Sequence, residues 1–64
     1  MTVRDLIARL AELPQDVPVV CHFHSEYGEV RSANTLHLVE NGGYYSTPYN
    51  PVDELRARLV VEVD

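Results

Sequence analysis

The opening of the chain, a capped amphipathic helix followed at once by a strand, constrains the fold more than any other feature. Apolar residues recur at the 3.6-residue spacing of one helix face: Val3, Leu6, Ile7, Leu10 and Leu13. Thr2 and Asp5 have the spacing of a capping box at the start of this helix, and Pro14 ends it. We therefore predict a helix over residues 2–13.

A strand is predicted over residues 17–24, where apolar residues recur at the two-residue period of a sheet. The face that includes Cys21 and Phe23 should meet the helix, and Cys21 is then a buried, unreactive thiol. Residues of the opposite face are Pro18, Val20, His22 and His24.

The middle of the chain predicts a hairpin. Residues 35–40 alternate as a second strand, and Asn41-Gly42-Gly43 is a strong turn signal. The returning strand is expected at residues 44–46, because Pro48 cuts it short.

The C-terminal part predicts a short helix and a closing strand. Asn50 as the cap and Pro51 at the first helical position favour one or two helical turns over residues 52–57. Residues 58–64 read as the last strand. Its core-facing residues are expected to be Leu59, Val61 and Val63, with Val60 facing away.

These elements predict an α+β fold, in which the N-terminal amphipathic helix packs on a small, mainly antiparallel three- or four-stranded sheet. A single domain should span residues 1–64. A chain of this size buries only about 60% of its unfolded surface, and its one cysteine permits no internal disulfide. The second sheet face is partly apolar, so we expect a homo-oligomer in which another copy covers it, or a binding surface: Val20, His22, His24, His37, Val39 and Val60.

Charge and hydropathy exclude some classes of partner. The formal net charge is −5, and the five arginines are scattered, so duplex nucleic acid lacks the basic stripe that it needs. No apolar run approaches the ~20 residues of a membrane span, and the amphipathic start is unlike a signal peptide. The single cysteine agrees with a reducing cytoplasm.

Three histidines form the one pattern that suggests a metal. His22 and His24 alternate onto one strand face, and His37 is expected to point the same way from a neighbouring strand. Such a set suits tetrahedral zinc with one open position, as in a small metal-dependent hydrolase. The alternative is three surface imidazoles on a half-exposed sheet. No other pattern of catalytic residues is present, so we expect a chain that is not an enzyme.

Four tyrosines lie in or next to predicted turns: Tyr27, Tyr44, Tyr45 and Tyr49. Rigid rings with hydroxyl groups are typical of recognition surfaces, where they stack on a base or contact a partner protein. The alternative is that they cap the ends of a small core. The candidate binding residues are therefore these tyrosines, with His22 and His24.

Residues 2–20 fit the pattern T-V-x-[DE]-L-I-x-x-L-x-x-L-P-x-D-x-x-V-V, and Asn41-Gly42-Gly43-Tyr44-Tyr45 and the valine-rich end follow. In these motifs the chain resembles a set of small, uncharacterised phage and prophage proteins. The resemblance covers most of the chain and implies an accessory protein made in the cytoplasm of an infected bacterium. It carries over no catalytic residue, and residues 21–24 depart from the pattern, where acidic residues and glycine are commoner.

The leading functional hypothesis is a non-enzymatic accessory protein that binds a host or phage protein, as a host-takeover factor or defence inhibitor. One alternative is sequestration of a nucleotide-like ligand between subunits, stacked on Tyr44 or Tyr45. Others are the zinc-dependent hydrolase and a component of the virion or its assembly.

Overall fold

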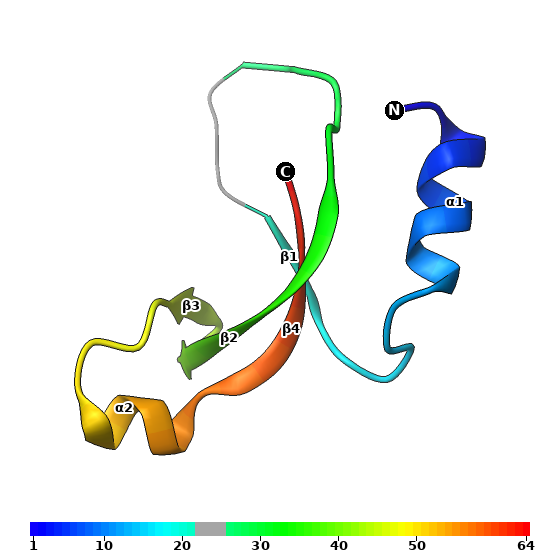
Figure 1. The fold of residues 1–64 in the computed structure, drawn as a ribbon. Coiled ribbons are helices and arrows are strands. Elements are labelled where there is room, and N and C mark those ends of the chain that lie inside the picture. Colours follow the sequence, from blue (N-terminus) through cyan, green and yellow to red (C-terminus); the bar gives the residue numbers. More distant parts are fainter. Residues whose placement is uncertain (22–25) are drawn as a thin grey trace.

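The computed structural model describes residues 1–21 and 26–64 (Figure 1). The described residues form α1 (Val3–Ala11), β1 (Val19–Cys21), β2 (Ala33–Asn41), β3 (Tyr44–Ser46), α2 (Pro51–Arg56) and β4 (Arg58–Val63). The strands form one sheet in the order β1-β4-β2-β3. The β1–β4 pairing is parallel, and the β4–β2 and β2–β3 pairings are antiparallel. The predicted α+β fold with a mainly antiparallel sheet is therefore confirmed.

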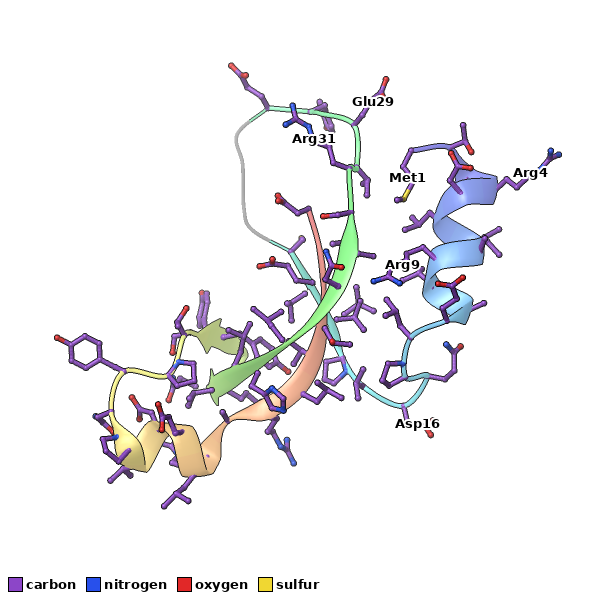
Figure 2. All side chains as sticks on the ribbon, viewed as in Figure 1. Met1, Arg4, Arg9, Asp16, Glu29 and Arg31 are labelled. Atoms are coloured by element: carbon purple, nitrogen blue, oxygen red, sulfur yellow. The ribbon has the colours of Figure 1, made fainter. Side chains whose placement is uncertain are left out.

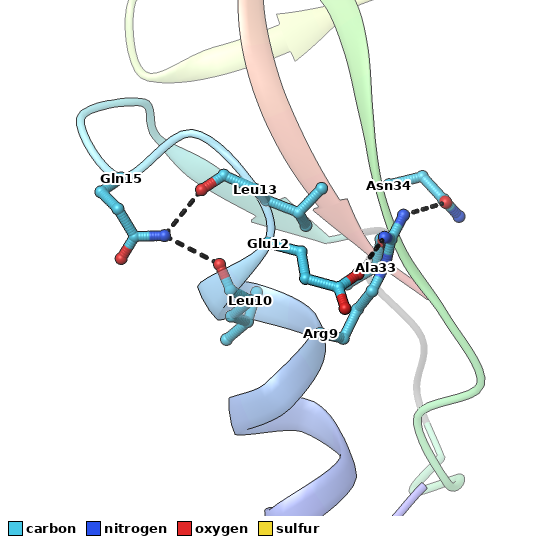
Figure 3. Close-up of polar contacts among 7 residues, drawn as sticks. All are labelled: Arg9, Leu10, Glu12, Leu13, Gln15, Ala33 and Asn34. Carbon is cyan, nitrogen blue, oxygen red and sulfur yellow. Dashed lines mark hydrogen bonds and ion pairs between the residues drawn. The ribbon is translucent and has the colours of Figure 1, made fainter.

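Helix α1 has the predicted cap and is shorter than predicted. The Thr2 hydroxyl oxygen accepts a hydrogen bond from the Asp5 N–H at 3.2 Å, and the Asp5 carboxylate accepts one from the Thr2 N–H at 3.1 Å. The Thr2 N–H stabilises the charged carboxylate, so the pKa of Asp5 lies below its ordinary value. After the helix, the Gln15 side-chain amide donates to the carbonyls of Leu10 and Leu13 at 2.8 and 2.7 Å (Figure 3).

Arg9 joins α1 to an open edge of β2. Ser32 and Asp64 exchange two backbone hydrogen bonds at 3.0 Å, so the next carbonyl along the chain, that of Ala33, points away from β4. Arg9 Nε donates to this carbonyl at 2.8 Å, and Arg9 Nη2 donates to Asn34 Oδ1 at 3.0 Å (Figure 3). The guanidinium therefore occupies backbone hydrogen-bonding capacity that a further strand would otherwise use.

The apolar face of α1 is only partly covered. Leu6, Leu10 and Leu13 are half-buried, whereas Val3 and Ile7 are 77% and 64% exposed. No residue of α1 is buried. The helix contacts the sheet along a narrower stripe than the five apolar residues predict.

The core lies around the two long strands. Its members among the described residues are Ala33, Leu38, Val39, Val60 and Val61. Val60 lies opposite Leu36, while Val61 lies between Val19 and Thr35. The expectation that Val60 faces away from the core is wrong, because β4 is a central strand and is covered on both faces at this point.

Strand β1 differs most from the sequence prediction. It spans three residues, and the remainder of the predicted strand, including Phe23, lies in residues 22–25, outside the described residues. Cys21 is exposed and Val19 is 61% exposed, so the prediction of a buried thiol is wrong. The physical reason is the position of β1 at the edge of the sheet, beside β4.

Candidate binding surface

The β2–β3 hairpin positions the first two tyrosines. Gly42 and Gly43 form a two-residue turn with φ angles of 57° and 91°, which glycine adopts without strain. Tyr44 and Tyr45 follow directly and point to opposite faces of β3. Tyr44 is 79% exposed, whereas Tyr45 is half-buried.

The N-terminus of α2 fixes the backbone of the third tyrosine. Asn50 Oδ1 accepts a hydrogen bond from the Asp53 N–H at 2.9 Å, and the Asp53 carboxylate accepts one from the Tyr49 N–H at 3.2 Å. Pro51 stands at the first helical position, as predicted. The ring of Tyr49 is nevertheless 93% exposed, so this local order holds the side chain in solvent.

Helix α2 adds two apolar side chains that the sequence reasoning missed. Val52 and Leu55 are 64% and 89% exposed, and their three-residue spacing places them on one side of the helix. Figure 1 shows β3 and α2 at the same end of the molecule, away from α1. We refer to Tyr44, Tyr49, Val52 and Leu55 together as the β3–α2 surface.

Charged groups lie beside the β3–α2 surface. Asp53 and Glu54 occupy the first turn of α2 and Arg56 the last, which suits the helix dipole. Glu40 and Arg58 form an ion pair at 3.6 Å on the neighbouring strands. Exposed apolar and aromatic groups with charged neighbours are characteristic of a protein interface.

Tyr27 does not belong to this surface. It is fully exposed in the segment 26–32. That segment, marked by the labelled Glu29 and Arg31, lies at the opposite end of the molecule from α2 (Figures 1 and 2). The four predicted tyrosines therefore lie in two separate regions.

The histidine hypothesis is only partly open to inspection. His22 and His24 lie outside the described residues. His37 pairs with Leu59 and Val20 with Glu62, so the expectation that Val20 and His37 share a sheet face is wrong: positions 59 and 62 of β4 point to opposite faces. Within residues 1–21 and 26–64, no group of three or more His, Cys, Asp or Glu side chains is placed to hold a metal ion.

A second exposed apolar region lies on α1. Val3, Arg4, Ile7 and Ala8 line an open groove of about 550 Å³ on the side of the helix that the sheet leaves uncovered. Its apolar character was visible in the sequence, but the helical spacing alone assigned Val3 and Ile7 to the sheet.

Comparison with family models, curated proteins and solved structures finds no significant match to this chain. In the part of the chain that the structure describes, no helix has the length and apolar character needed to cross a membrane. The functional reading therefore rests on the exposed surfaces themselves.

Proposed function

We propose that this chain is a non-enzymatic binding module, a phage accessory protein that acts by binding a protein of the host or of the phage through the β3–α2 surface. The observation that carries the proposal is the exposure of Tyr44, Tyr49 and Leu55, between 79% and 93%, on one short segment. A contiguous group of exposed large apolar side chains on a small protein is typical of an interaction site.

The local structure supports recognition rather than loose exposure. The cap at Asn50 and Asp53 and the proline at the start of α2 restrict the backbone that carries Tyr49. Such ordering lowers the conformational entropy that a partner must remove on binding. Tyrosine at the centre of an interface is also among the residues whose loss costs most affinity.

The test is retention of a partner by the immobilised chain from lysate of phage-infected bacteria. The variant Tyr49→Ala/Leu55→Ala removes two side chains of the surface that contribute little to the core. The matched control is Tyr27→Ala, an equally exposed tyrosine at the other end of the molecule.

We expect one protein to be retained by the wild type and by Tyr27→Ala, and reduced about tenfold or more by the double variant. Equal retention by all three proteins, or retention of nothing, contradicts the proposal. Circular dichroism of the double variant confirms that its fold is intact.

A further inference from the structure

The chain exposes more surface than a protein of its mass does when it is alone. Its accessible surface is 5449 Å² and its mass is 7.3 kDa. A compact monomer of that mass exposes about 4,150 Å², so the excess is roughly 1,300 Å². Each partner contributes about 800 Å² to a standard interface. The radius of gyration of 13.0 Å likewise exceeds the ~11 Å expected for a compact chain of this length.

Part of this excess lies on α1. At 3.6 residues per turn, Val3 and Ile7 lie about a fifth of a turn from Leu6 and Leu10. The apolar stripe is therefore continuous around the helix, and the sheet half-buries only the side formed by the leucines. The rest faces solvent, as does the groove beside it.

The charges next to the stripe favour one particular occupant. Arg4, Ala8 and Glu12 follow one another at four-residue intervals, so they form a row along the helix, with a cation at one end and an anion at the other. In an antiparallel pair of α1 helices centred on Ala8, Arg4 of each copy faces Glu12 of the other. A parallel pair would instead place like charges together.

We propose that a second copy of this chain docks on α1, with the two helices antiparallel about a two-fold axis near Ala8. Val3 and Ile7 of both copies form the apolar centre, and the small Ala8 side chains let the helices approach closely. Two Arg4–Glu12 pairs between the copies set the orientation. This dimer uses a different surface from the β3–α2 surface, so it does not depend on the proposed function.

The experiment is sedimentation equilibrium of three proteins with reversed charges. Arg4→Glu makes both ends of the row acidic, and Glu12→Arg makes both ends basic. Arg56→Glu, on α2, is the matched control. We expect the wild type and Arg56→Glu to have twice the 7.3 kDa chain mass. Each α1 variant alone should dissociate about tenfold or more readily.

The decisive arm is the equimolar mixture of Arg4→Glu and Glu12→Arg. In an antiparallel heterodimer all four end charges are again opposite, so dimer affinity should return to within about threefold of the wild type. A monomeric wild type overturns the proposal. So does a dimer that neither variant weakens, or a mixture in which affinity is not restored.

A second variant separates loss of the interface from loss of the fold. Ile7 is 64% exposed, so Ile7→Asp should keep the circular dichroism of the wild type while abolishing the dimer. A dimer that persists in Ile7→Asp overturns the proposal. Tyr49→Ala/Leu55→Ala should remain dimeric, which distinguishes failure of this inference from failure of the proposed protein-binding role.

Discussion

Asp5 shows how one side chain serves the fold locally rather than through the partner that the sequence suggests. The four-residue spacing favours an ion pair with Arg9, but the Asp5 carboxylate accepts the Thr2 N–H, and Arg9 turns to β2. The reason is that an unpaired backbone N–H at a helix start has no other partner, whereas an exposed ion pair contributes little.

The lowered pKa of Asp5 predicts a pH dependence. A carboxyl whose folded pKa is depressed stabilises the fold above its unfolded pKa of about 3.9, and this stabilisation is lost as pH falls through the folded pKa. We expect Asp5→Asn to lower the urea midpoint at pH 7, with the difference from wild type vanishing near the acid end. Asp16→Asn is the control for loss of one negative charge. A difference that persists unchanged below the folded pKa contradicts the assignment.

At the scale of elements, α1 depends on one polar side chain for its attachment to β2. Arg9 →Met keeps much of the aliphatic length and removes the bonds to the Ala33 carbonyl and Asn34. We expect a loss of about 1 to 2 kcal/mol in the free energy of unfolding. Hydrogen exchange should show the loss of protection concentrated in α1. Arg4→Met is the control for removing a guanidinium from the same helix, and equal effects of the two variants would contradict the role of Arg9.

The β2–β3 hairpin depends on its turn in the same way. Gly42 has a φ of 57°, in the left-handed region, and a Cβ there meets no atom within 4 Å. Gly42→Ala should therefore cost about 1 to 2 kcal/mol from backbone strain alone. Gly42→Asn should cost less, because asparagine tolerates this conformation. Urea midpoints of the two variants check the order, and the reverse order would contradict a backbone origin.

Elements were predictable where short-range chemistry determines them. The caps at Thr2 and Asn50 and the turn at Gly42-Gly43 act within a few residues, and all three are present. Which face of an element is covered was not predictable, because it depends on strand order. The central position of β4 buries both Val60 and Val61, and the edge position of β1 exposes Cys21. The same limit hid Val52 and Leu55 from the candidate site.

At the scale of the whole molecule, the large exposed surface predicts that stability depends on protein concentration. A partner that binds only the folded chain stabilises it by mass action. We expect the thermal midpoint of the wild type to rise with protein concentration and that of Ile7→Asp to stay constant. Differential scanning calorimetry over a wide concentration range measures this. A constant midpoint for the wild type would contradict dimerisation through α1.

The small core also makes the molecule sensitive to a single cavity. Val60 is fully buried between β2 and β1, and the described part of the chain has five buried apolar residues. Val60→Ala removes two methyl groups and should cost about 2 to 3 kcal/mol. A chain of this length has about 3 to 10 kcal/mol in total, so the variant should lose a large part of its stability. Val19→Ala, at a site that is 61% exposed, is the matched control and should cost much less. Similar urea midpoints for the two variants would show that β4 is not the centre of the core.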